Sequence, residues 1–309
     1  MTHLDFLNSN YPKRRSDDEK QKFREYIIEK LASKGIEARV EKTNDGKNNN
    51  LIIGDPTTAK AVFTAHYDTP MQSLFPNIMI PKNFAIFYLY QFVPVIFLLL
   101  ISIVVSYLVG MVLFEDQVVY MISFLVLYYG GFFLMMRAFE NKNNFNDNTS
   151  GVSVLLSIID LLSADQLSNL AFIFFDNEEK GKKGSAAYVK DHKEQMNDRF
   201  LVNFDCVGNG DYIIFIAQKD AVSSKEFEML KDSFIEDDRF KVDFTTHKKA
   251  QSNSDHKNFA KGVACVACKR SKWGIFYTPY IHTPKDIVAD NANIAYLSKN
   301  TLEFIKKIS

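Results

Sequence analysis

Two long stretches without a single charged residue constrain this chain more than any other feature. The first covers residues 84–114 and the second residues 118–136, and only Glu115, Asp116 and Gln117 separate them. A helix needs about 20 apolar residues to cross the ~30 Å hydrocarbon layer of a bilayer, and each stretch meets that length. We therefore predict a transmembrane hairpin of two helices. A buried helical lid or an oligomer interface is the alternative reading.

The residues around these stretches predict how the hairpin is oriented. Pro94 is expected to kink the first helix, and the pair Gly130 and Gly131 to let the second helix pack closely. Lys82 and Arg137 flank the side from which the chain leaves and to which it returns, and the connecting loop carries neither Lys nor Arg. Under the positive-inside rule, both polar parts then face the cytoplasm. We expect an integral protein of a bacterial-type cell membrane.

The bulk composition excludes several classes of protein. Lys plus Arg and Asp plus Glu both number 37 in 309 residues, so the formal net charge is zero and no nucleic-acid partner is expected. Three cysteines are too few for a disulfide framework, and an odd number cannot all pair with one another. Cys265 and Cys268 form a lone CxxC without a second pair, so we interpret both as small buried hydrophobic residues. The first twenty residues have no apolar core, and no signal peptide is expected.

On both sides of the predicted hairpin, apolar strands alternate with amphipathic helices, which indicates an α/β fold. Helices are expected at 17–35, 152–162, 184–192 and 295–308. Strands are expected within IEARVEK, NNLIIG, AKAVFTAHYD, LAFIFFDNEE, FLVNFDCVG, DYIIFIA and VACVACKR. Without the hairpin the two polar parts join into one alternation of strands and helices. We therefore expect a single domain formed by residues 1–80 and 141–309, with residues 81–140 inserted as the hairpin.

Acids and histidines follow the apolar strands at five places. They are His66 and Asp68 in HYD, Asp147 in NDNTSG, Glu178 and Glu179 in NEE, Asp205 in FDCVG, and His282 in HTPKD. The carboxyl ends of strands in an open α/β sheet converge on one crevice, where isolated charges are costly to bury. Imidazole nitrogens and carboxylate oxygens are ligands that zinc accepts, and this number of them suits two ions with a shared ligand. The sequence has no HExxH helix motif, so a single-zinc site of that type is excluded.

The ordered set HYD, NDNTSG, NEE, FDCVG, SDHKNF and HTPKD resembles the dizinc aminopeptidases related to bacterial leucyl aminopeptidase and aminopeptidase Y, metallopeptidase family twenty-eight. Each motif alone is a weak signal, whereas all six in order are a strong one. The resemblance covers roughly residues 17–80 and 141–305, and the hairpin departs from it. It implies a three-layer α/β/α sandwich with a mixed, mostly parallel central sheet.

The resemblance also implies a role for each residue. Asp147 bridges two zinc ions, His66 and Asp205 complete one, and Glu179 and His282 complete the other. Glu178 is the general base that takes a proton from a metal-activated water, and Asp68 orients the ring of His66. Co²⁺ or Mn²⁺ are possible in place of Zn²⁺.

These expectations describe a membrane-anchored hydrolase, a metallo-exopeptidase acting as an aminopeptidase on short peptides. The partners are the peptide substrate and the lipid bilayer, and the oligomeric state stays open. A carboxypeptidase, another amide hydrolase or a glutaminyl-cyclase-like enzyme on the same fold are alternatives. Lys269 and Arg270 are candidate cations for a carboxypeptidase. A non-catalytic membrane receptor or scaffold is the alternative from another class.

Overall fold

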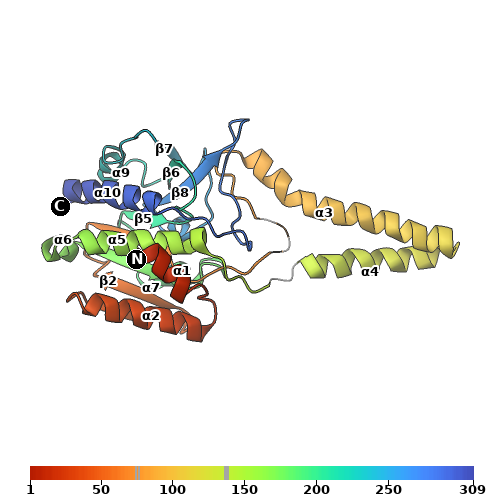
Figure 1. The fold of residues 1–309 in the computed structure, drawn as a ribbon, viewed down its shortest axis with the longest axis horizontal. Helices are drawn as coiled ribbons and strands as arrows, with labels where there is room; N and C mark the ends of the chain where they lie inside the picture. Colours follow the sequence, from red (N-terminus) through yellow and green to blue (C-terminus); the bar gives the residue numbers. More distant parts are fainter. Residues whose placement is uncertain (74, 76, 136–138) are drawn as a thin grey trace.

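A mixed β-sheet forms the centre of the polar part of the molecule (Figure 1). The computed structural model describes residues 1–73, 75, 77–135 and 139–309. Within these residues the sheet has the strand order β1-β2-β4-β3-β5-β8-β6-β7, and β9 pairs with β8. The strands are β1 (Ala38–Lys42), β2 (Asn49–Gly54), β3 (Ala61–His66), β4 (Leu170–Phe175), β5 (Leu201–Phe204), β6 (Tyr212–Ala217), β7 (Lys241–Thr246), β8 (Gly262–Arg270) and β9 (Phe276–Tyr277).

The middle of the sheet is parallel and its flanks are antiparallel. β4, β3, β5 and β8 run in the same direction, whereas β2 pairs antiparallel with β4, and β6 with β8. β3 and β4 are buried along their whole length, as expected for parallel strands that are covered on both faces. The parallel register brings the carboxyl ends of β3, β4 and β5 to one edge of the sheet.

Helices cover both faces of the sheet. Phe63 of β3 points into a core shared with α1, α2, α5, α9 and α10, and its neighbour Val62 points into a second core shared with α7 and α8. These helices are α1 (His3–Asn10), α2 (Asp17–Ala32), α5 (Gly151–Leu161), α7 (Lys183–Asp191), α8 (Lys193–Met196), α9 (Lys225–Lys231) and α10 (Asn291–Ile308), and the short α6 (Ala164–Ser168) precedes β4. The expected α/β/α layering with a mixed sheet is confirmed.

Most elements lie where periodicity predicts them, but α1, α6, α8, α9, β7 and β9 were not predicted. α1 is a short helix whose start is stabilised by a capping box between Thr2 and Asp5. β7 joins the edge of the sheet with mostly half-buried residues, so its sequence lacks a strong apolar pattern. The predicted burial of Cys265 and Cys268 is confirmed, and Cys206 is buried as well; all three cysteines are free.

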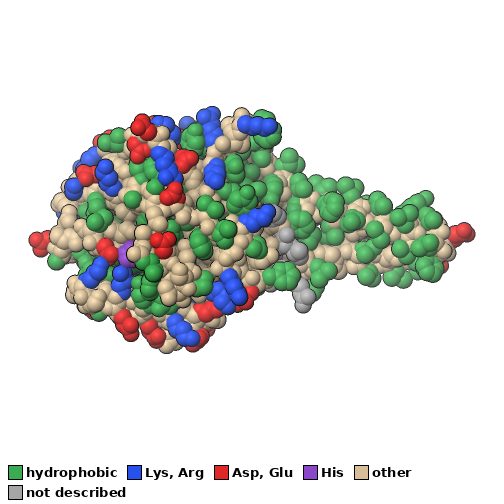
Figure 2. Space-filling model, in the orientation of Figure 1, with side chains coloured by type: hydrophobic (Ala, Val, Ile, Leu, Met, Phe, Trp, Pro, Cys, Tyr) green, Lys and Arg blue, Asp and Glu red, His purple; other side chains and the backbone are tan. Residues whose placement is uncertain are grey.

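Two long helices leave the polar body side by side and form the hairpin (Figure 1). α3 (Phe84–Tyr107) continues into a π-helical stretch, Leu108–Leu113, and α4 (Gln117–Met135) returns. Both are long and apolar enough to cross a membrane. Apolar side chains cover the visible face of the hairpin (Figure 2). Only 17% of the most apolar window of α3 and none of that of α4 is buried, so neither is a core helix.

Glycines allow the two helices of the hairpin to approach closely at two places. A Cβ atom on Gly110 would lie 2.3 Å from the backbone of Tyr120, and one on Gly131 would lie 2.5 Å from the side chain of Leu98. Gly130 has open space on its outer side, so only Gly131 of the predicted pair serves this packing. Pro94 lies inside α3, which continues through it. The predicted flanking cation Arg137 lies outside the described residues.

A buried ion pair ties α2 to the end of β4. The ammonium group of Lys20 lies 2.7 Å from a carboxylate oxygen of Asp176, and both side chains are almost inaccessible to solvent. Asp176 also accepts a hydrogen bond from the backbone N–H of Asn49. Asp176 is inaccessible to solvent because α2 covers this end of the strand.

We expect Lys20→Met to lower the free energy of unfolding by about 3–5 kcal/mol, because the charge of Asp176 would remain buried without its partner. Thermal unfolding of the full chain measures the effect. Lys22→Met is the matched control, since Lys22 forms an exposed pair with Asp18 on the same helix and should leave stability nearly unchanged. Equal effects of both substitutions would contradict the structural role of the buried pair.

Candidate metal centre

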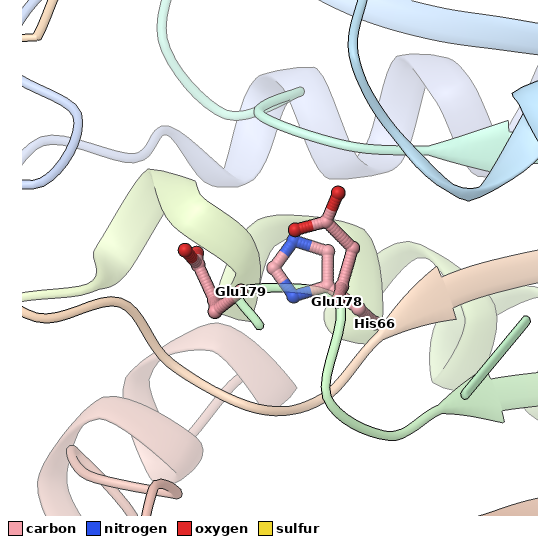
Figure 3. A group of neighbouring side chains, drawn as sticks. All are labelled: His66, Glu178 and Glu179. Atoms are coloured by element: carbon pink, nitrogen blue, oxygen red, sulfur yellow. The ribbon is translucent and has the colours of Figure 1, made fainter. Parts of the chain in front are cut away.

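Three neighbouring strands deliver polar side chains to the same edge of the sheet. His66 is the last residue of β3, and Asp205 directly follows β5. Glu178 and Glu179 lie in the loop after β4, and Figure 3 shows both beside the imidazole of His66. Ligand atoms of His66, Glu178 and Glu179 all lie within 4.8 Å of one another. The parallel register thus brings together residues that are far apart in the sequence.

Asp147 lies in a turn, Phe145–Ser150, that comes directly before α5. One carboxylate oxygen of Asp286 accepts a hydrogen bond from the backbone N–H of Asn146 (3.0 Å), and the other accepts one from the N–H of Asp147 (3.0 Å). The peptide bond between Asp147 and Asn148 is cis. Asp286, the last residue of the HTPKD motif, thus holds the backbone of Asp147.

The same turn is fastened to the end of β5. The side-chain amide of Asn148 donates to the carbonyl of Phe204 (2.9 Å), and its oxygen accepts from the N–H groups of Gly151 and Cys206. A Cβ atom on Gly151 would lie 2.3 Å from the carbonyl oxygen of Phe204, so only glycine permits α5 to begin this close to the strand. These contacts set the position of Asp147 relative to Asp205.

His282 comes from a loop that also contacts the base of the hairpin. Its backbone has a left-handed conformation with φ of 57°, and its carbonyl accepts a hydrogen bond from the N–H of Ser73 (3.0 Å). The adjoining Gln72 pairs with Phe139 through two backbone hydrogen bonds of 2.8 and 3.0 Å. The segments on either side of the hairpin therefore meet next to the loop that carries His282.

The predicted ligands form two groups that share Asp147. In one group, Nε2 of His66 lies 3.4 Å from Oδ1 of Asp147 and 3.7 Å from Oδ1 of Asp205. In the other, Nε2 of His282 lies 3.1 Å from Oδ2 of Asp147 and 3.4 Å from Oε2 of Glu179. Each carboxylate oxygen of Asp147 thus faces a different histidine.

These separations fit ligands that share a metal ion. Two ligand atoms at 2.0–2.1 Å from a tetrahedral zinc ion lie about 3.3 Å from one another, close to the four separations in both groups. Oδ1 of Asp205 is buried and has no hydrogen-bond partner among the described residues. A buried carboxylate oxygen of this kind is costly without a partner. The donor set of imidazole and carboxylate therefore suits a pair of zinc ions.

The electrostatics of the cluster favour added positive charge. Burial raises the pKa of Glu179 to about 8. Burial lowers the pKa of His282, but Glu179 and Asp147 outweigh this effect and raise it to about 9. Bound cations would supply the positive charge and displace the imidazole proton, so metal affinity in such a cluster falls as the pH falls.

Asp68 contacts the site in two ways. Its backbone carbonyl lies 3.1 Å from Nδ1 of His66, whereas its carboxylate lies 3.6 Å from that atom. The carboxylate accepts hydrogen bonds from the backbone N–H groups of Glu178 (3.0 Å) and Glu179 (3.2 Å). Asp68 thereby connects the loop after β4 to the end of β3.

Arg14 supports the site and was missed in the sequence. Its guanidinium is fully buried and donates to the carbonyls of Tyr67 and Tyr11 and to the hydroxyl of Thr149. Burial lowers its pKa to about 10, against the opposing effects of Asp68 and Asp147. In the sequence Arg14 belongs to the polar stretch YPKRRSDDEK, which resembles an exposed surface segment. Only the tertiary contact reveals its place.

Asp255 and His256, from the SDHKNF motif, are buried beside the cluster. Asp255 accepts a hydrogen bond from the hydroxyl of Ser185 (2.5 Å), and neither residue belongs to the two ligand groups around Asp147. Tyr277 and Tyr280 line a separate cavity of about 470 Å³.

A cavity of about 750 Å³ opens over the two ligand groups and reaches the hairpin. Glu178, Glu179 and Asp205 line its floor. Its wall includes residues from the first turns of α3, namely Phe87, Tyr88, Tyr90, Gln91 and Pro94. The hairpin therefore forms part of the candidate site and not only an appendage of the domain.

Comparisons with known proteins agree with this geometry. Residues 138–305 match Peptidase family M28. The LapA aminopeptidase of Legionella pneumophila is similar in structure, with a TM-score of 0.58 and 16% identity over 99% of this chain and 69% of its own. A Zn-dependent exopeptidase from Parabacteroides distasonis has a TM-score of 0.58 and 16% identity. The similarity covers 98% of this chain and 95% of the exopeptidase.

A glutaminyl cyclase from Porphyromonas gingivalis is similar too, with a TM-score of 0.57 and 13% identity. The similarity covers 99% of this chain and 97% of the cyclase. Comparison with curated proteins by sequence gives no match. At these identities the solved structures establish the fold. The match to the family covers more than half of the chain. The protein therefore belongs to peptidase family M28 and is a hydrolase of the metallo-exopeptidase type.

Proposed function

We propose that the protein is a membrane-anchored dizinc aminopeptidase that removes N-terminal residues from short peptides. The observation that carries this proposal is the position of Asp147, whose two carboxylate oxygens face His66 and His282 separately. This arrangement suits a ligand that bridges two ions. Asp205 would complete the zinc site of His66, and Glu179 that of His282.

Zinc held by these residues would supply a Lewis acid that polarises the scissile carbonyl and lowers the pKa of the attacking water. In this mechanism Glu178 takes the proton from the attacking water and delivers it to the departing amine nitrogen. Its carboxyl lies beside His66 and lines the cavity, where it has access to a substrate. Asp68 and Asp286 accept hydrogen bonds from the backbones of Glu178 and Asp147 respectively. They thereby fix the positions of the base and of the bridging ligand.

The lengths of the two hairpin helices support the proposed membrane anchor. The continuous helix Phe84–Leu113 has 30 residues and α4 has 19. At 1.5 Å per residue these correspond to about 45 Å and about 28 Å, so α4 matches the hydrocarbon layer of about 30 Å and the longer helix exceeds it by about 15 Å. The excess lies at the start of α3, where its residues line the cavity. In this arrangement residues 81–140 are a hairpin inserted into one peptidase domain, which we place on the cytoplasmic side.

The position of the cavity points to peptides with apolar residues as substrates. Its wall carries the aromatic side chain of Phe87 at the level where α3 leaves the bilayer in the proposed arrangement. Peptides that partition to the membrane surface would reach the site by this side.

A carboxypeptidase remains the second candidate, because two cations line the cavity. They are Lys182 and Lys257, and the amine of each lies near the side-chain oxygen of Asn253. Lys269 and Arg270, the cations suggested by the sequence, line a different hollow. Digestion of a peptide library with free, N-blocked or C-blocked ends separates the two activities. Cleavage that requires a free N-terminus supports the aminopeptidase, and cleavage that requires a free C-terminus overturns it.

We expect Glu178→Gln to retain bound zinc and to lower kcat by about 10²–10⁴-fold, because the amide cannot accept the proton of the attacking water. Elemental analysis and turnover of the same preparation measure both quantities. Glu194→Gln, on the exposed surface of α8, is the control and should change neither. Full turnover by Glu178→Gln would refute the role of this residue as base.

Elemental analysis of the purified full chain should give two zinc ions per molecule, and a chelator should lower Tm because binding stabilises the folded state. We expect Asp286→Asn to weaken metal binding by about 10–100-fold, since it loses one of the two acceptors that hold the turn of Asp147. Asp238→Asn, at an exposed position, serves as the control. A stoichiometry of one ion would favour the glutaminyl-cyclase-like alternative instead.

We expect Phe87→Ala to lower kcat/KM for peptides with an apolar N-terminal residue by about 10-fold, and for polar ones by less, because it removes an apolar wall of the cavity. Leu89→Ala is the matched control, since Leu89 lies in the same turn of α3 but is 63% exposed and outside the cavity lining. The ratio of kcat/KM between leucyl and seryl peptides reports the selectivity. An unchanged ratio in Phe87→Ala would show that α3 does not select the substrate.

A further inference from the structure

The loop between β8 and β9 presents an exposed aromatic residue among basic ones. It runs from Lys269 to Gly274 with the sequence KRSKWG, and Trp273 is 76% exposed. Lys269, Arg270 and Lys272 are exposed as well. A large aromatic side chain left in solvent beside three cations is typical of a surface that meets the headgroup layer of a membrane.

The loop is a firmly built turn. The backbone N–H of Ser271 donates to the carbonyl of Ile275 (2.9 Å), and the N–H of Gly274 donates to the carbonyl of Ser271 (2.9 Å). The hydroxyl oxygen of Ser271 accepts a further hydrogen bond from the N–H of Ile275 (3.1 Å). Gly274 has a φ of 79°, which glycine adopts without strain. The turn therefore holds Trp273 outward without the support of a core.

Contacts attach the base of this loop to the segment that leads into the hairpin. The ammonium group of Lys82 lies 4.9 Å from the centre of the ring of Phe276, in β9. Met79 pairs with Thr278, directly after β9. Figure 1 shows the loop beside the start of α3, on the side of the sheet from which the hairpin leaves. A membrane crossed by α3 would thus lie next to the loop.

Among the residues that the structure describes, no acid forms an ion pair with the three cations of the loop. In the part of the chain that the structure describes, Lys269 and Arg270 have no ion pair, and the ammonium group of Lys272 packs over the ring of Trp273 at 4.7 Å. They line a hollow of about 560 Å³ that also contains Asp211, whose carboxylate already pairs with Arg239. The excess positive charge complements the phosphates of anionic lipids.

We propose that the Lys269–Gly274 loop is a second membrane contact, in which Trp273 enters the headgroup layer and the three cations bind anionic lipid phosphates. This inference rests on the proposed membrane anchor. A loop contact beside the hairpin would add a second point of attachment and so fix the rotation of the domain against the bilayer. The mouth of the cavity would then face the membrane surface in one orientation.

The chain contains a single tryptophan, so Trp273 reports its own environment without labelling. The experiment compares tryptophan emission of the full chain in nanodiscs of zwitterionic lipid and in nanodiscs that contain anionic lipid. We expect blue-shifted emission in the anionic nanodiscs, quenching by lipids brominated near the headgroup, and protection from acrylamide. Emission and acrylamide quenching that are identical in both nanodiscs, without quenching by brominated lipid, would overturn the proposal.

A triple variant, Lys269→Gln with Arg270→Gln and Lys272→Gln, should lose the dependence on anionic lipid and keep its peptidase turnover in detergent. The matched control replaces Lys22, Lys219 and Lys225 with Gln, because these exposed lysines lie outside the loop. We expect this control to behave as the unchanged protein does. Equal loss of the lipid effect in both variants would mean that overall charge, and not the loop, is responsible.

Flotation of the full chain with lipid vesicles after alkaline extraction separates the two proposals. Protein that floats while Trp273 stays accessible to acrylamide refutes the loop contact and leaves the hairpin anchor intact. Protein that remains in the soluble fraction refutes the anchor itself. A blue shift with an RNA oligonucleotide but not with anionic nanodiscs would identify the loop as a nucleic-acid contact and overturn the lipid assignment.

Discussion

Gathering several carboxylates at one edge of a buried sheet costs free energy, and the arrangement of the candidate site follows from this cost. Asp147, Glu179 and Asp205 lie within a few ångströms of two imidazoles, and such a cluster is unfavourable unless positive charge is shared among its members. A carboxylate with one oxygen toward each histidine is the simplest way to distribute that charge. The parallel strands, the turn before α5 and the loop of His282 all serve this arrangement.

The support around the cluster consists of backbone hydrogen bonds more than of contacts to the ligands themselves. Asp286 holds the turn of Asp147, and Asp68 holds the two N–H groups of the glutamates. Arg14 adds a buried positive charge that links the N-terminal segment to this region. The precision of such a site comes from fixing the backbone that carries the ligands.

The sequence predicts the strands and the residues at their ends because both signals are local. Each motif lies directly after an apolar strand, and parallel pairing then brings the motifs together. The contributions of Arg14 and Lys20 could not be predicted, since each depends on a partner more than a hundred positions away and lies in an ordinary polar stretch. The cavity wall from α3 was missed for a similar reason. An uncharged stretch indicates a membrane helix, but its length does not tell which of its turns face a neighbouring domain.

The longer arm of the hairpin has a mechanical consequence. Its first turns line the cavity and its remainder packs tightly on α4 at Gly110, so the wall of the cleft and the proposed lipid-embedded rod are one continuous piece of helix. Tilting that rod would shift the wall against the fixed floor of the sheet. Because helices tilt to match the thickness of the surrounding lipid, a change in bilayer thickness would change the width of the cleft.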